Sequence, residues 1–213
     1  MLVEPMSADV LVWLVNEWGS VPRAAAGEDQ APYPDTDLLA ALLAGSGVRS
    51  CPPAALILPA LRQVADQLHR VFAAAGLGER VALVAALLAG TAVRPALEMD
   101  LDLAEGRPSA TWRVDDAPQV LLAAAALTLR DQLAEHEPDR IGVCSGRRCA
   151  DAFIDASPAG QRRFCSVTCQ NRARVAAWRQ RQSSPRQSSP RQSSPHQSSP
   201  HQSSPHQNSQ AQG

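Results

Sequence analysis

Residues 144–181 read CSGRRCADAFIDASPAGQRRFCSVTCQNRARVAAWRQR, and this stretch holds four of the five cysteines of the 213-residue chain. The four follow the pattern C-x4-C-x15-C-x3-C. In a reducing cytoplasm, closely spaced cysteines bind metal more often than they form disulfides. Four thiolates at about 2.3 Å complete a tetrahedron around zinc and leave no position for water. The spacing therefore predicts one structural Zn2+ ion bound by Cys144, Cys149, Cys165 and Cys169.

The residues around these cysteines predict a small treble-clef-like finger over residues 140–181. Gly146 favours a tight knuckle between the first two cysteines. Residues 153–155 and 162–164 are expected to pair as a hairpin, and residues 166–181 are expected to form a helix. The second pair of cysteines would then lie at the start of that helix, where the positive end of the helix dipole stabilises thiolates.

Charge is divided unevenly between the two ends of the chain. The formal net charge is −1, but residues 1–139 hold 9 Arg against 19 Asp and Glu, a balance of −10. Residues 140–213 hold 11 Arg against two Asp, a balance of +9. Salt screens charges beyond about 10 Å, so each end acts through its own local field. The basic finger is expected to attract phosphate, and the acidic body is not.

Eight arginines and one asparagine of the finger are the candidate nucleic-acid contacts: Arg147, Arg148, Arg162, Arg163, Asn171, Arg172, Arg174, Arg179 and Arg181. On the expected helix Arg172 and Arg179 are seven residues apart, and so are Arg174 and Arg181. Residues at this spacing share nearly one helical face, so the helix carries two arginine rows that can contact phosphates on both sides of a groove. Arginine also reads guanine through two parallel hydrogen bonds.

Some finger residues have an alternative role inside the fold. Arg163 can either contact phosphate or pair with Asp155 across the expected hairpin. Val175 and Trp178 are expected to pack the helix onto the knuckle and not to stack on a base.

The body, residues 1–139, is predicted to be mainly α-helical with one small β-hairpin, an α+β domain. Hydrophobic residues make up 45% of the chain but aromatics only 4%, which favours close-packed helices filled by Ala, Leu and Val. Periodicity and caps predict helices over residues 10–18, 35–43, 59–75, 79–89 and 117–136. Alternation predicts strands over residues 97–103 and 110–114, with Gly106 and Pro108 in the turn.

The body carries no catalytic constellation, so the chain is not expected to be an enzyme. His69 and His136 lie in predicted helices beside charged neighbours and are expected at the surface. Three acidic residues alternate along one predicted strand and are expected to form a solvated face: Glu98, Asp100 and Asp102. Cys51 is a lone thiol before two prolines, and no role is expected for it.

The chain is expected to be soluble and cytoplasmic, with no membrane partner. Its first apolar run, residues 10–15, is too short for a signal peptide. The longest uncharged apolar stretches, residues 81–93 and 117–129, fall short of the roughly 18 residues that span a bilayer.

Residues 182–213 form a low-complexity tail built on five Gln-Ser-Ser-Pro pentads. The tail has almost no side chain that could contribute to a core, and a proline at every fifth position forbids a helix, so disorder is expected. Two interpretations stay open: an expanded repeat without function, or a basic arm that helps to hold DNA.

The finger resembles the bacterial CGNR-type zinc finger. The resemblance covers residues 144–181 and is carried by the phenylalanine before the third cysteine and by Cys169, Gln170, Asn171 and Arg172, which stand where the family has Cys-Gly-Asn-Arg. The glycine of that tetrad is replaced here by Gln170. A helical backbone tolerates this replacement.

The body is similar in the order and spacing of its elements to the N-terminal domain of stress-induced transcription regulators (ABATE-like). The points of likeness are Leu14, Val15 and Asn16 in the first helix, the Leu61-Arg62 helix and the hairpin before the last body helix. The resemblance implies a bacterial transcription regulator whose finger binds double-stranded DNA and whose body senses a small-molecule effector or forms a homodimer. The alternative is a zinc-stabilised protein-interaction or RNA-binding module that does not bind DNA.

Overall fold

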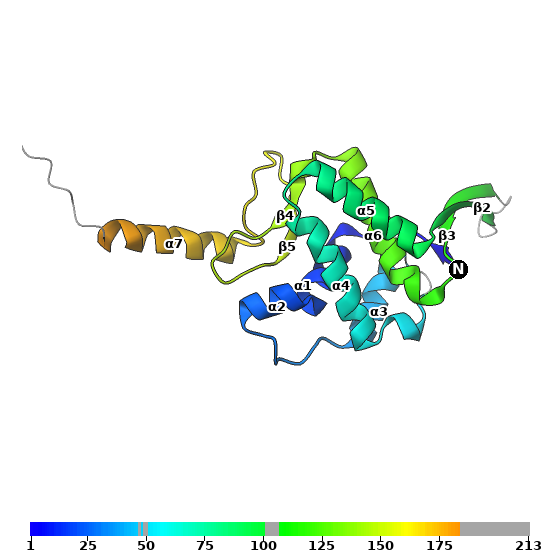
Figure 1. Ribbon diagram of the computed structural model, residues 1–213, viewed down its shortest axis with the longest axis horizontal. Helices are drawn as coiled ribbons and strands as arrows, with labels where there is room; N and C mark the ends of the chain where they lie inside the picture. The colour runs from blue at the N-terminus through cyan, green and yellow to red at the C-terminus, as the bar shows by residue number, and fades with distance from the viewer. Residues whose placement is uncertain (47, 49–50, 101–106, 184–213) are drawn as a thin grey trace, which may run out of the picture.

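The computed structural model describes residues 1–46, 48, 51–100 and 107–183, and it confirms a mainly helical protein with small antiparallel sheets (Figure 1). Its α-helices are α1 (Ala8–Trp18), α2 (Ser20–Ala26), α3 (Thr36–Gly45), α4 (Leu58–Ala73), α5 (Leu77–Thr91), α6 (Val120–Glu135) and α7 (Val167–Ser183). Short 3-10 helices are η1 (Pro53–Ala55), η2 (Ala117–Gln119) and η3 (Pro138–Arg140). The strands are β1 (Leu2–Val3), β2 (Arg94–Asp100), β3 (Arg107–Arg113), β4 (Ile141–Val143) and β5 (Ala152–Ile154). None of the described helices is long and apolar enough to cross a membrane.

The helices predicted from periodicity all form, with ends shifted by a few residues. α1 begins at a cap, because the Ser7 hydroxyl accepts a hydrogen bond from the Val10 N–H at 3.4 Å. The Asp35 carboxylate caps α3 in the same way, through the Asp37 N–H at 2.9 Å. The predicted stripe on α4 is buried: Leu61, Val64, Ala65, Leu68, Val71 and Phe72. The tail was expected to be disordered from residue 182, but Gln182 and Ser183 form the end of α7, and residues 184–213 lie outside the described part of the chain.

One short body helix, α2, was not predicted. It follows directly after Gly19, and its first turn is held from another element, because the Asp66 carboxylate of α4 accepts from both the N–H and the hydroxyl of Ser20, at 2.7 and 2.8 Å. The cap is 46 residues away along the chain. A helix that is capped by a residue so distant in the chain has no cap signal in its local sequence.

The core of the body is built around α6. Every residue of α6 from Val120 to Leu129 is buried, and the helix packs against α5, α4, α1 and β1. A helix that is apolar on all sides belongs in the interior. The four consecutive alanines, residues 123–126, allow neighbouring helices to approach closely. The other large buried side chains come mainly from α1, α3 and α4, including Trp18, Leu39 and Phe72.

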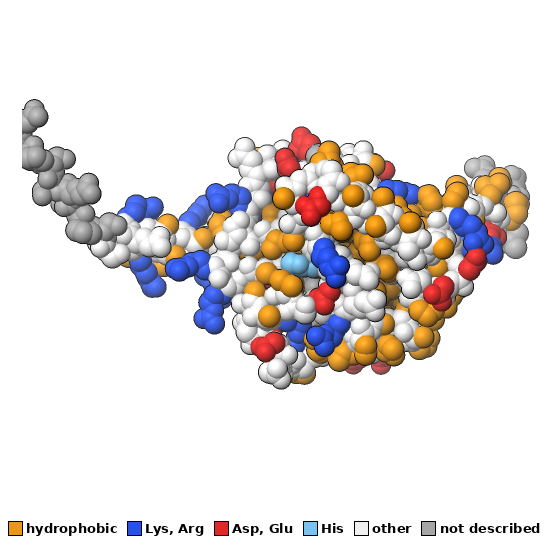
Figure 2. Space-filling model, viewed as in Figure 1, with side chains coloured by type: hydrophobic (Ala, Val, Ile, Leu, Met, Phe, Trp, Pro, Cys, Tyr) orange, Lys and Arg blue, Asp and Glu red, His pale blue; other side chains and the backbone are white. Residues whose placement is uncertain are grey.

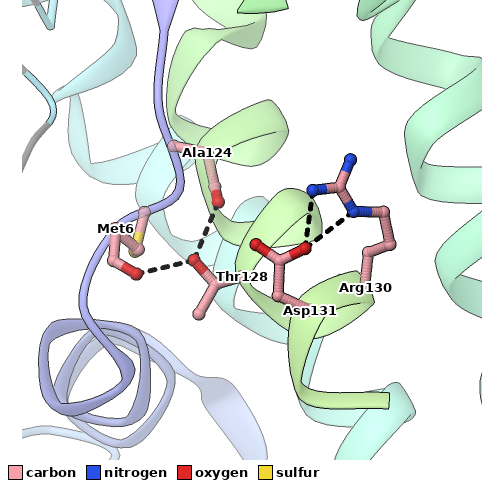
Figure 3. Close-up of polar contacts among 5 residues, drawn as sticks. All are labelled: Met6, Ala124, Thr128, Arg130 and Asp131. Carbon is pink, nitrogen blue, oxygen red and sulfur yellow. Dashed lines mark hydrogen bonds and ion pairs between the residues drawn. The ribbon is translucent and has the colours of Figure 1, made fainter. Parts of the chain in front are cut away.

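The N-terminal segment is tied to this central helix. The Thr128 hydroxyl lies 2.7 Å from the Met6 carbonyl oxygen and 3.0 Å from the Ala124 carbonyl oxygen, and it can donate to either (Figure 3). Two residues further along α6, Arg130 forms an ion pair with Asp131 (Figure 3), and its guanidinium lies 4.5 Å from the centre of the Trp112 ring. The start of the chain, α6 and β3 are therefore fastened together.

The predicted body hairpin exists, but its turn is placed differently. β2 pairs antiparallel with β3, and β1 adds a third strand in the order β1-β3-β2. Pro108 is not in the turn, because it lies in β3 opposite Met99. Gly106 and residues 101–103 of the expected first strand lie outside the described residues.

The exposed and buried faces of β2 also differ from the expectation. Leu97 and Met99 are exposed, whereas Glu98 is half-buried and forms an ion pair with Arg113 of β3. The structure describes no side chain for Asp100 or Asp102, the other members of the expected acidic face. The hairpin projects from the helical body at one end, and α7 projects at the other (Figure 1).

Candidate metal centre and its arginine surface

The hairpin of the finger uses a different pair of strands from the predicted one. β5 pairs with β4, with Ile141 opposite Ile154 and Val143 opposite Ala152. Residues 162–164 form no strand. The knuckle is the loop of this hairpin, and the Cys144 N–H extends the pairing by donating to the Asp151 carbonyl at 2.9 Å. The closed knuckle thus brings β4 beside β5. Residues 162–164 contact this hairpin without pairing as a strand, for example through the Arg163 carbonyl, which accepts from the Ser145 N–H at 2.9 Å.

The hairpin is docked onto the body through backbone hydrogen bonds as well as apolar contacts. Ile141 and Ala152 belong to the hydrophobic core that α1, α4 and α6 build. The Asn16 side chain of α1 pairs with Ala152 as a strand would, accepting from its N–H at 2.8 Å and donating to its carbonyl at 3.1 Å. These contacts fix the finger relative to α1.

His69 was expected at the surface, and that prediction is wrong. The side chain is only 6% exposed, and its Nε2 lies 2.8 Å from the carbonyl oxygen of Ala150, between the knuckle and β5. His69 follows Ala65 of the apolar stripe by one helical turn, and this spacing was the signal that places it against the core. The charged neighbours on α4 point elsewhere. His136, after α6, is exposed as expected.

The four predicted cysteine ligands come together. Their sulfur atoms all lie within 4.8 Å of one another, and none is in a disulfide. The Sγ atom of Cys165 is 3.5 Å from that of Cys149 and 3.6 Å from that of Cys169. A tetrahedron with zinc–sulfur bonds of about 2.3 Å has sulfur atoms about 3.8 Å apart. The arrangement therefore fits one structural zinc ion, held by thiolates alone.

Local structure explains how the ligands are presented. A Cβ atom at Gly146 would lie 3.3 Å from the Cys149 Cβ and 3.4 Å from the Cys144 Sγ, so the knuckle closes most easily around glycine. The Ser166 hydroxyl accepts from the Cys169 N–H at 3.3 Å, just before the first turn of α7. Gln170 lies within α7, where the replacement of glycine requires no unusual backbone.

Asp155 is buried at the end of β5, where it organises the loop that leads to Cys165. Its carboxylate accepts from the N–H groups of Ser157 and Arg162, at 2.9 and 2.7 Å. The hydrogen bonds from Ser157 and then Arg162 hold the pKa of this carboxyl below its usual value. The ion pairs of the described residues include none between Arg163 and Asp155, and the Asp155 oxygens bind backbone donors instead. The Arg163 side chain is exposed.

All nine candidate nucleic-acid contacts are exposed. Figure 2 shows the basic side chains gathered along α7 and beside it, on one end of the molecule. Arg162 differs from the others, because its guanidinium donates to the carbonyls of Phe164, Cys165 and Ile154 and therefore also holds the finger together. The remaining seven arginines surround the knuckle and α7.

Val175 and Trp178 do not pack onto the knuckle, so that prediction is wrong. They are 46% and 55% exposed, and Val167 on the same helix is 71% exposed. In α7 the buried residue is Cys169. Helix packing needs a facing element, and the structure places none of the body against the outer side of α7 (Figure 1).

Cys51 stands apart from the metal centre, as expected. It is half-buried beside the core of the body, and burial raises the pKa of its thiol to about 11. A thiol with this pKa is protonated near neutral pH and is a poor nucleophile and metal ligand.

The fold and the ligand set define a zinc-binding module of the four-cysteine type attached to a helical body. Residues 140–182 match the family model described as the CGNR zinc finger. A search of curated proteins gave no match to the chain. The cysteines Cys144, Cys149, Cys165 and Cys169 of this matched segment hold one structural zinc ion.

Proposed function

We propose that the protein is a DNA-binding transcriptional regulator that contacts double-stranded DNA through α7 and the zinc knuckle. The observation that carries this proposal is the set of exposed arginines around the metal centre, on a segment that has no acidic residue after Asp155. Such a surface attracts phosphate and binds it through charge-assisted hydrogen bonds. The metal has no open position, so it orients these arginines and performs no chemistry.

The geometry of α7 suits a nucleic-acid groove. The helix extends from the body without a protein element on its outer side (Figure 1). Its paired arginines form two rows, Arg172 with Arg179 and Arg174 with Arg181. An α-helix fits the major groove, and rows on its two sides can contact phosphates of both strands. We further propose that the body has a regulatory role, in which it binds a small-molecule effector or forms a homodimer. This part rests on the resemblance of residues 1–139 to the N-terminal domain of stress-induced transcription regulators.

The first test compares two double variants of the full zinc-loaded chain. Arg172→Ala with Arg179→Ala removes one row of the proposed surface. Arg62→Ala with Arg70→Ala removes two exposed arginines from α4 and is the matched control. Genomic fragments that bind the unmodified protein are selected, and affinity is measured over a range of salt concentrations.

We expect the α7 variant to bind more weakly and with a smaller salt dependence, because log K falls by about 0.9 per log unit of salt for each neutralised phosphate. Loss of both contacts should reduce that slope by nearly two, and the α4 control should keep it. Equal binding by both variants would show that the DNA surface lies elsewhere. Binding to RNA or protein, with none to DNA, would instead support the interaction module.

A further inference from the structure

We propose that Val167, Val175 and Trp178 form an apolar stripe on α7 that contacts thymine methyl groups in the major groove of DNA. The inference rests on the proposed function and adds to it the part of the surface that reads sequence. Arginines that bind phosphate position a protein on the duplex, whereas contacts to base edges distinguish one sequence from another.

The three side chains lie on one side of the helix. Val167 and Trp178 are eleven residues apart, close to three turns of about 3.6 residues, and Val175 precedes Trp178 by three residues. With a turn of about 100° per residue, the stripe occupies an arc of about 80°, and the exposed Asn171 lies within this arc between Val167 and Val175. It is about 16 Å long at about 1.5 Å per residue, which matches nearly five base pairs at about 3.4 Å.

The two arginine rows border this stripe. By the same helical geometry, Arg174 and Arg181 lie along one edge of the stripe, and Arg172 and Arg179 lie along the other. An apolar strip between two basic rows matches the major groove in cross-section, where base edges lie between two phosphate backbones. The arginines alone would not need a hydrophobic strip between them.

The opposite side of α7 faces the metal centre. Cys169 is buried there, and Ala173 and Ala176 line a cavity of about 580 Å³ with Gly146 of the knuckle. The side of α7 toward the finger thus carries small residues and the buried cysteine, while its three largest apolar side chains lie on the other side. Burial of the stripe requires a molecule outside the described chain.

Charge identifies that molecule as DNA and not as a second copy of the stripe. Two α7 helices packed stripe to stripe would bring four arginine rows together, and the helix has no acidic residue to offset them. Like charges in contact oppose such pairing. Phosphates provide the complementary charge, and the thymine C5-methyl is the apolar group that base pairs expose in the major groove.

The test is a double-mutant cycle between protein and DNA. The full zinc-loaded chain and Trp178→Ala are titrated with a selected duplex and with duplexes in which single thymines are replaced by uracil, which lacks the methyl group. Leu97→Ala, which removes an exposed apolar side chain from the distant β2, is the control. Zinc content and helicity of each variant are measured in parallel, and truncation of the exposed Trp178 opens no cavity.

We expect uracil at the contacted positions to weaken binding of the unmodified protein about fourfold per methyl. The same replacement should change binding of Trp178→Ala by less than twofold, whereas Leu97→Ala should behave like the unmodified chain. Equal sensitivity of the unmodified protein and Trp178→Ala to uracil would overturn this inference and leave DNA binding standing. Absence of any DNA binding by the unmodified protein would overturn the proposed function itself.

Sedimentation of the free protein tests the other possibility, that a second copy of the chain covers the stripe. If the stripe contacts DNA, the unmodified protein and Trp178→Ala should sediment with the same mass in the absence of DNA. A dimer that dissociates on this substitution would assign the stripe to self-association and would contradict the proposal.

Discussion

Asp155 stabilises the finger because its carboxylate accepts hydrogen bonds from the backbone N–H groups of Ser157 and Arg162. In Asp155→Asn one acceptor oxygen becomes an NH2 group that faces an N–H donor. A buried donor left without an acceptor costs about 1–3 kcal/mol, so the free energy of unfolding should fall by that amount at neutral pH. Denaturant unfolding of the variant and of Asp29→Asn, an exposed control, measures the difference.

The same residue predicts a pH dependence. The folded state lowers the pKa of Asp155, so the stability it contributes is fully present above the unfolded value of about 3.9 and is lost as pH falls through the folded pKa. The difference in unfolding free energy between the unmodified chain and Asp155→Asn should therefore shrink in acid. A difference that stays constant down to the lowest pH at which the chain folds would argue against the ionised carboxylate as the cause.

At the scale of the element, the start of α7 is both a helix end and part of the metal site. Ser166 caps the helix at the N–H of a ligand, Cys169. Removal of an N-cap hydroxyl typically costs about 1 kcal/mol. Because this part of the helix orders around the ion, Ser166→Ala should weaken zinc affinity about fivefold, as measured by competition with a chelator.

Ser183→Ala provides the matched control for this element, because it removes an exposed serine hydroxyl from the other end of the same helix. It should leave zinc affinity unchanged. If the two serine variants bind zinc equally well, the cap does not support the metal centre.

At the scale of the whole molecule, the finger and the body share a core. Ile141 and Ala152 are buried with the body helices, and Asn16 and His69 bind the backbone of the hairpin. Removal of zinc should therefore lower the melting temperature of the body as well as that of the finger. Tryptophan fluorescence of Trp178→Ala, whose remaining tryptophans all lie in the body, is followed during heating with and without a chelator and reports on the body.

A control for this experiment is Cys51→Ala, which leaves the four ligands intact and should show the same response to chelator as the unmodified chain. A body transition that does not respond to zinc removal would show that the finger unfolds independently, despite its contacts with α1 and α4.

The sequence by itself determined the features that depend on neighbouring residues. The spacing of Cys144, Cys149, Cys165 and Cys169 predicted the metal centre because ligands a few residues apart need only a knuckle and a helix turn to meet. The stripe on α4 predicted its buried face because helical periodicity brings residues three and four apart together. The arginine rows of α7 follow from the same rule.

The tertiary structure decided what depends on distant residues. β5 pairs with β4 and not with residues 162–164, because short strands have little register preference of their own and the closed knuckle chooses the partner. His69 is buried because the hairpin happens to supply a carbonyl, at Ala150, that satisfies its ring nitrogen. Trp178 is exposed because none of the described helices and strands of the body packs against that side of α7. For α7, unlike α4, burial depended on whether another element packs against the helix, and the pattern of α7 does not determine that.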